Sequence, residues 1–299
     1  MDIKELVSRY ASHPEVKALG RALCDKKCSR VMIDGMQGSA LPLAFASLSV
    51  SHPKALATPF MFVSNDQEEA GYLYQDLKQM LGDDRVLFFP STFKRGIKNG
   101  QKDTANEILR TDVLSKLASG ILPLFVVTFP DALCELVVSH EELSDQTLVL
   151  HRGEMIDITF LQDTLLEFGF QRTDYVYEPG QFAVRGGIVD IYSFSSEYPF
   201  RVDFFGDEVN SIRTFDLQTQ LSMSHKDDIT IVPELKHTRQ KQVSVLQFLP
   251  EQTVMVMSDL KYLCECVQHI YDVGFSTQAS IEQDATGEQK VWDRETTLV

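Results

Sequence analysis

The stretch "QRTDYVYEPGQFAVRGGIVDIYSF" (171–194) says most about how this chain folds. β-Branched and aromatic residues are spread through it, and such residues favour extended strands. Pro179-Gly180 and Gly186-Gly187 interrupt the stretch, as turn residues do. Shortly afterwards "RVDFFGDEVNSI" (201–212) alternates apolar and polar residues around Gly206-Asp207, which predicts a hairpin. We therefore expect an antiparallel sheet here.

The sequence before about residue 131 has a different pattern, in which short apolar runs alternate with segments of helical periodicity. Such alternation predicts a parallel, doubly wound α/β sheet. A later apolar run, "TVMVMSD" (253–259), is followed by another helical segment, and we expect it to return to this first sheet. The antiparallel body is then an insertion. The strands expected in the first part are "RVMID" (30–34), "PFMFVSND" (59–66), "RVLFFP" (85–90) and "LPLFVVTF" (122–129).

Composition limits the classes of function. The 299 residues are 43% hydrophobic and carry a formal net charge of −15. The N-terminus has no signal peptide, and no apolar run is long enough to span a membrane, so we expect a soluble, cytoplasmic protein with no membrane contact. Five cysteines without framework spacing fit a reducing compartment, and no metal site is expected. An acidic chain is a poor DNA ligand, and only the loop from Lys94 to Lys102 is basic.

A glycine-containing loop, "GMQGSALPL" (35–43), follows the first predicted strand. Gly35 and Gly38 are spaced as at the start of the phosphate-binding pattern G-x-x-x-x-G-K-[ST]. The later positions of that pattern, which call for Gly, Lys and a hydroxyl, are Ala40, Leu41 and Pro42. Leu41 brings no charge, and Pro42 brings neither a hydroxyl nor an N–H. The loop is thus either a nucleotide site that has lost its chemistry or an ordinary strand-to-helix turn.

The runs "QRTDYVYEPGQFAVRGGIVDIYSF" (171–194) and "YPFRVDFFGDEVNSIRTFDLQTQLS" (198–222) carry a specific resemblance. They resemble the domain 2 module of UvrB, the damage-verifying subunit of bacterial nucleotide excision repair. They look even more like the corresponding module of the transcription-repair coupling factors (Mfd). The rest of the chain is similar in domain order, which identifies it as an N-terminal, UvrB-like region of such a factor, cut from something longer.

The resemblance implies three parts: a degenerate P-loop NTPase-like domain (1–130), a UvrA-binding module (131–218) and a shortened segment returning to the first domain (219–299). UvrB keeps an intact phosphate loop and an Asp-Glu motif, whereas this chain has Ser258-Asp259 at the second place. Because the Lys and hydroxyl of the phosphate loop and the Asp-Glu motif are both missing, the resemblance implies a nucleotide site that no longer functions. It also implies no catalysis and no cofactor in this segment. ATP and Mg are expected only in the motor domains of the parent, an ATP-dependent DNA translocase.

In the family, this module docks on UvrA through arginines. By resemblance, the contacts here are Arg172, Arg185 and Arg201, with Phe182 and Tyr192 as apolar anchors. Phe182 and Tyr192 fit a core position equally well, and Arg201 could simply face solvent.

The implied function is non-catalytic recruitment of UvrA to stalled RNA polymerase in transcription-coupled nucleotide excision repair. Implied partners are UvrA, the rest of the coupling factor and, indirectly, RNA polymerase. The alternatives are an active UvrB-type ATPase and a DNA-binding module.

Overall fold

The structure is a computed structural model that describes residues 2–25, 27–56, 59–82, 85–92, 104–120, 124–235, 242–273, 281–283 and 289–291. Its helices are α1 (Ile3–Tyr10), α2 (Pro14–Cys24), α3 (Ala40–Ser51), α4 (Gln67–Leu81), α5 (Thr104–Ser119), α6 (Pro130–Cys134), α7 (His140–Asp145), α8 (Ile158–Glu167) and α9 (Leu260–Val273), with 3-10 turns η1 (Pro53–Leu56) and η2 (Val245–Phe248). Its strands are β1 (Phe60–Val63), β2 (Val86–Phe88), β3 (Phe125–Thr128), β4 (Val137–Val138), β5 (Leu148–His151), β6 (Gln171–Arg172), β7 (Gln181–Arg185), β8 (Ile188–Ile191), β9 (Phe200–Phe205), β10 (Glu208–Phe215), β11 (Ser222–Lys226), β12 (Asp228–Ile231), β13 (Gln242–Val243), β14 (Val254–Met257), β15 (Ile281–Gln283) and β16 (Gln289–Val291).

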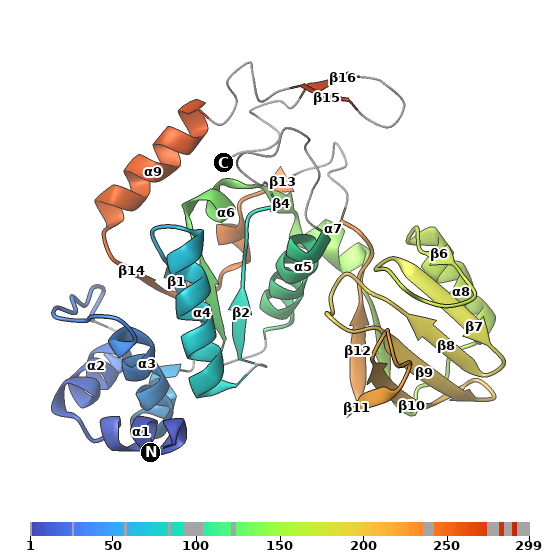
Figure 1. Ribbon diagram of the computed structural model, residues 1–299, viewed down its shortest axis with the longest axis horizontal. Helices are drawn as coiled ribbons and strands as arrows, with labels where there is room; N and C mark the ends of the chain where they lie inside the picture. Colours follow the sequence, from blue (N-terminus) through green and yellow to red (C-terminus); the bar gives the residue numbers. More distant parts are fainter. Residues whose placement is uncertain are drawn as a thin grey trace.

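The first body is built on a parallel sheet in the order β14-β1-β3-β2 (Figure 1). All four residues of β1 and of β3 are buried, which explains why these strands are continuous apolar runs. Phe60 stacks on Phe125 with ring centroids 5.4 Å apart, and Phe45 of α3 meets Phe60 and Phe62 edge-on. The parallel sheet expected from the alternating pattern is confirmed.

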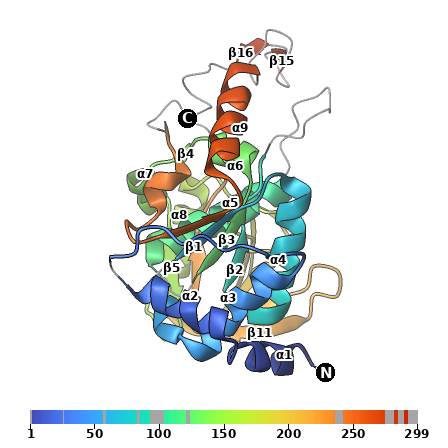
Figure 2. The same ribbon diagram turned by 90° about the vertical axis from the view of Figure 1, so that its left-hand side faces the viewer.

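The N-terminal region forms the helices α1, α2 and α3, which pack together beside the sheet (Figure 2). The helical periodicity of residues 2–24 is split in two at Pro14, which occupies the first turn of α2. Pro is well suited to that place because the first helical N–H groups have no intrahelical acceptor. The His13 imidazole caps this helix by accepting from the Glu15 N–H at 3.3 Å.

The second body contains a six-stranded sheet in the order β11-β10-β9-β8-β7-β6. Its pairs are antiparallel except β6 with β7, so the expected antiparallel sheet is confirmed with one parallel edge pair. The β9–β10 hairpin turns at Gly206, whose φ of 63° suits glycine. Gly187 is needed for a different reason, because a Cβ there would lie 2.9 Å from the Phe204 carbonyl oxygen. Leu161 and Leu165 of α8 pack into the core of this body.

Two short antiparallel pairs join the bodies: β4 with β13, and β5 with β12. After them, β14 pairs in parallel with β1, so the second body is inserted into the first. The core of the first body includes Val137 and Leu143, whereas that of the second runs from Leu150 to Ile231. The boundaries expected at 131 and 218 differ from this division, because buried residues of α6, α7 and β4 belong to the first core.

The prediction of a strand at residues 30–34 is wrong. Residues 30–34, "RVMID", have no strand pairing, and Met32 is 89% exposed. Ile33 packs against the first core, so the segment passes beside the sheet instead of entering it. The apolar residues that suggested a buried strand therefore do not indicate one here.

Candidate protein-interaction site

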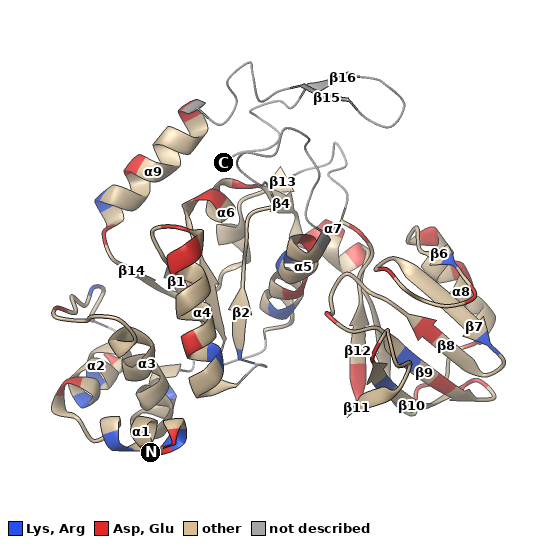
Figure 3. Cartoon of the chain, viewed as in Figure 1, with Lys and Arg blue, Asp and Glu red and all other residues tan. Residues whose placement is uncertain are grey.

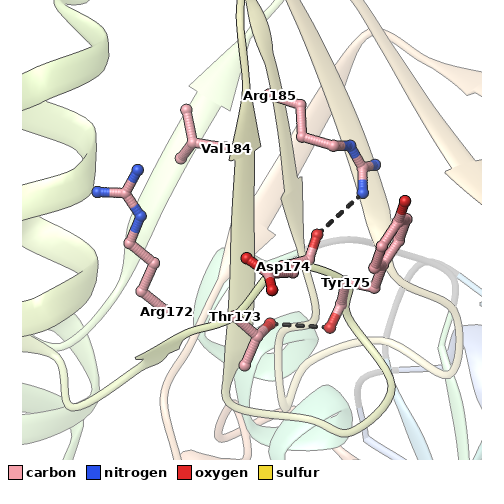
Figure 4. A pocket seen from close by; sticks show the side chains of 6 residues that line it. All are labelled: Arg172, Thr173, Asp174, Tyr175, Val184 and Arg185. Carbon is pink, nitrogen blue, oxygen red and sulfur yellow. Dashed lines mark hydrogen bonds between the residues drawn. The ribbon is translucent and has the colours of Figure 1, made fainter.

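A groove of about 660 Å³ lies at the β6–β7 edge of the second body. It is lined by Arg172, Thr173, Asp174, Tyr175, Val184 and Arg185. Figure 4 shows Arg172 and Val184 on one side of this lining and Arg185 and Tyr175 on the other, with the two guanidinium groups pointing away from each other. The parallel pairing of β6 with β7 creates the groove, because it sets Arg172 opposite Phe182 and brings the loop after β6 alongside Arg185. We call it the arginine groove.

Arg185 is held in place from three sides. Its guanidinium forms an ion pair with Asp190, donates from Nη1 to the Asp174 carbonyl oxygen at 3.2 Å and lies 4.9 Å from the centre of the Tyr175 ring. Its side chain is nevertheless 35% exposed. Arg185 thus presents a charged, fixed group to the groove.

Asp190 is shared between two arginines. Arg201 binds it bidentately, from Nε at 2.7 Å and Nη2 at 2.8 Å, and lies over the Phe215 ring at 4.4 Å. The hydrogen bond to Asp190 raises the pKa of Arg201. Two guanidinium groups therefore share one buried carboxylate, and the cluster keeps a surplus positive charge that reaches solvent at Arg185.

Arg201 does not line the groove. Its side chain is 15% exposed, and its Nη1 donates to the Gln220 carbonyl oxygen at 3.1 Å. Among the described residues outside glycine, Gln220 alone has a positive φ, of 59°. Arg201 thus supports the loop at Gln220 and fixes Asp190, so in this structure it positions Arg185 instead of offering its own charge to a partner.

Arg172 is exposed on β6, and its guanidinium has no hydrogen-bond or ion-pair partner within the described part of the chain. The two other expected contacts lie elsewhere. Phe182 is fully buried in the core of the second body. Tyr192 is buried too, and donates from its hydroxyl to the Glu197 carbonyl oxygen at 2.8 Å. Burial is the main cause that raises the pKa of Tyr192. Both aromatic residues form the support beneath the groove.

The residues missed from the sequence are Asp190 and Tyr175. Asp190 lies directly opposite Arg201 in the β8–β9 pair, so strand register would have predicted the ion pair. Tyr175 lies in the loop after β6, and no periodic pattern reports which way a loop side chain faces. The blue segments of the ribbon in Figure 3 mark basic residues on β6, β7 and β9.

The glycine loop keeps its turn without the strand that should precede it. Gly35 and Gly38 have φ angles of 76° and 54°, and the chain then enters α3 at Ala40. Leu41 packs against the first core and Pro42 is buried in the first turn of α3. The loop therefore presents apolar side chains where a phosphate loop presents Lys and a hydroxyl.

Ser258 and Asp259, which stand where UvrB has its Asp-Glu motif, are also engaged in local hydrogen bonds. The Ser258 hydroxyl donates to Asn65 Oδ1 at 2.8 Å, and Asp259 accepts from the Lys261 N–H at 2.8 Å. Asp259 thus caps α9. The crevice around it, which Pro130 and Tyr262 also line, is too narrow for a water-sized group.

Three further expectations concern a basic loop, a metal site and a membrane-spanning helix. The basic loop Lys94–Lys102 lies outside the described residues. In the part of the chain that is described, no three His, Cys, Asp or Glu side chains are grouped to hold a metal ion. No helix there is long and apolar enough to cross a bilayer.

Comparison with known proteins places this groove in a recognised domain. Residues 148–237 match the family model of the UvrB interaction domain, which coincides with the second body from β5 past β12. The chain is 29% identical over 202 residues to the transcription-repair-coupling factor of Bacillus subtilis, covering 68% of the chain and 17% of that protein. It is 26% identical over 205 residues to that of Escherichia coli, covering 68% and 17%. With that of Haemophilus influenzae it shares 33% over 120 residues, covering 40% and 10%.

The chain thus resembles transcription-repair coupling factors over about two thirds of its length, and residues 148–237 resemble the UvrB interaction domain. It spans about a sixth of the length of these relatives, at 17% of the Bacillus subtilis protein.

Proposed function

We propose that this chain is a non-catalytic docking region that recruits UvrA through the arginine groove. The observation that carries the proposal is the positive charge of the groove in the UvrB interaction domain, where Arg172 and Arg185 outnumber the single carboxylate of Asp174. In a chain of net charge −15, such a spot favours a partner segment rich in carboxylates. Arg suits this role because its planar fork pairs bidentately with a carboxylate.

In this proposal the region serves transcription-coupled nucleotide excision repair, with UvrA brought to a stalled RNA polymerase by a longer coupling factor. The chain itself needs no ATP, Mg or other cofactor, which belong to the motor of that longer protein. The rest of the coupling factor is its second partner, and RNA polymerase is reached indirectly. The apolar Leu41 and the cap role of Asp259 support the absence of nucleotide chemistry.

The test measures the affinity of this chain for UvrA by isothermal titration. The variant Arg172→Glu plus Arg185→Glu is expected to bind at least ~100-fold more weakly, which corresponds to about 2.7 kcal/mol. The charge-matched control is Arg9→Glu plus Arg152→Glu, two exposed arginines away from the groove. The control is expected to lose less than about threefold. Equal affinity of wild type and groove variant would refute the proposal.

A further inference from the structure

Two exposed tyrosines lie in the loop that follows β6. Tyr175 lines the groove and is 51% exposed, and Tyr177 is 64% exposed two residues later. Val176 between them is buried and packs with Ala183 and Tyr192. The inward side chain of Val176 anchors the loop, and both neighbouring rings are left in solvent.

The backbone beneath these rings is held by side-chain hydrogen bonds. The Thr173 hydroxyl donates to the Tyr175 carbonyl oxygen at 2.9 Å. The N–H groups of Tyr177 and Glu178 donate to Gln181 Oε1 at 2.9 and 3.1 Å. The loop therefore loses little conformational entropy when a partner covers it, which favours tight binding.

Tyr175 is also coupled to the charged part of the groove. The guanidinium of Arg185 lies 4.9 Å from the centre of its ring, within the range of a cation–π contact. A partner that reaches Arg185 consequently comes close to the ring of Tyr175. Exposed tyrosines beside arginines are the composition that dominates binding energy at protein interfaces, because each ring buries a large area with only two rotatable bonds.

We propose that the partner-binding surface extends from the arginine groove onto Tyr175 and Tyr177. The docking segment of the partner then carries an apolar side chain next to its carboxylates. This inference rests on the proposed function, whose partner is UvrA. It adds a salt-independent, apolar component to an interface that the arginines alone would make electrostatic.

The experiment compares the affinity for UvrA of the wild-type chain, of Tyr175→Ser plus Tyr177→Ser, and of Tyr175→Phe plus Tyr177→Phe. The serine variant is expected to bind about tenfold more weakly both at low salt and at about 0.5 M salt, because apolar burial is not screened. The phenylalanine variant keeps the rings and is expected to stay within about threefold of wild type. Thermal unfolding of each variant shows whether the chain remains folded.

The controls are Tyr72→Ser, which removes an exposed ring from α4, and Phe205→Ser, which removes an 81% exposed ring from the β9–β10 turn. Both are expected to bind like wild type. A loss in Phe205→Ser as large as in the double serine variant would overturn the inference. So would a serine-variant loss that vanishes at high salt, since the tyrosines would then act only through Arg185.

The two proposals fail differently. If the arginine variant loses binding and the serine variant does not, the tyrosine surface is refuted and the docking function stands. If wild type does not bind UvrA, or the arginine variant binds normally, the docking function fails and the inference falls with it.

Discussion

Each body of this chain holds a buried carboxylate, and the two are paired in different ways. In the first body Glu135 accepts from the Ser91 hydroxyl, from the Thr92 N–H at 3.0 Å and from the Thr92 hydroxyl at 2.9 Å. It also pairs with Arg110 at 3.3 Å, and both side chains are buried. In the second body Asp190 serves two arginines, of which one reaches solvent.

The guanidinium of Arg110, unlike that of Arg185, is surrounded by buried partners. Its Nη1 donates to the Pro90 carbonyl oxygen at 2.8 Å, and its guanidinium lies over the Phe89 ring at 4.1 Å. Burial lowers the pKa of Arg110, and the charge of Glu135 opposes that shift. The charge of Glu107 opposes the shift as well, so the buried guanidinium of Arg110 is fully compensated and leaves no positive charge at the surface.

Similar ion-pair chemistry thus leaves different net charges at the surface of the two bodies. A balanced pair that is fully buried links α5, α6 and the segment after β2. An unbalanced cluster, exposed to water mainly at Arg185, leaves positive charge at the surface. The ratio of guanidinium groups to carboxylates, and the exposure of the outermost guanidinium, separate the two cases.

The largest effect is expected from breaking the balanced pair. Glu135→Ala leaves Arg110 buried without its counter-charge and should lower the free energy of unfolding by about 3–5 kcal/mol. Urea denaturation measures this change. Glu141→Ala, an exposed carboxylate on α7, is the control and should change stability by about 0.5 kcal/mol or less. A Glu135→Ala loss below about 1 kcal/mol would show that the pair is not the structural link described above.

A smaller loss of stability is expected from the unbalanced cluster. Asp190→Asn removes the charge shared by Arg185 and Arg201 and should cost about 2–3 kcal/mol, less than in the first body because Arg185 can turn to water. The extra positive charge should make the binding of UvrA more sensitive to salt. Asp203→Asn, on the same sheet, is the matched control. The comparison fails if Asp190→Asn leaves both stability and salt dependence at the values of the control.

The smallest expected effect is no measurable change at all. Titration with ATP and Mg should show no binding tighter than ~0.1 mM, about −5.5 kcal/mol. The variant Leu41→Lys plus Pro42→Thr should likewise show no binding of ATP and Mg, because residues 30–34 form no strand that would place the loop at a sheet edge. Binding by this variant alone would mean that the missing side chains, not the missing strand, account for the difference.

Much of the fold could be predicted from local pattern. The runs that became β1 and β3 are continuous and apolar, as buried parallel strands require. The run that became β14 is equally apolar, but β14 is a partly exposed edge strand. The Gly206 turn and the return of β14 to β1 followed from turn chemistry and from the switch of periodicity. The strand predicted for "RVMID" (30–34) was wrong because an apolar run indicates only that a segment avoids water. It does not indicate which part of the protein covers the segment.

The candidate site was predicted less completely. Arg172 and Arg185 were named from the motif and lie in one groove, whereas Phe182, Tyr192 and Arg201 from the same motif lie beneath it. A strand alternates its side chains between two faces, but sequence does not say which face is covered. Tyr175 lies in a loop, where even this alternation is absent.

The sequence by itself determined the two kinds of sheet, the insertion of one body in the other and the absence of a Lys and a hydroxyl from the glycine loop. These features depend on side-chain type and spacing along the chain, which are local properties. Only the tertiary structure decided that Asp190 is divided between Arg185 and Arg201, and that Tyr175 stands beside the outer one. Charge balance and exposure depend on which segments meet in space, and that is settled when the strands pair and α8 closes the core.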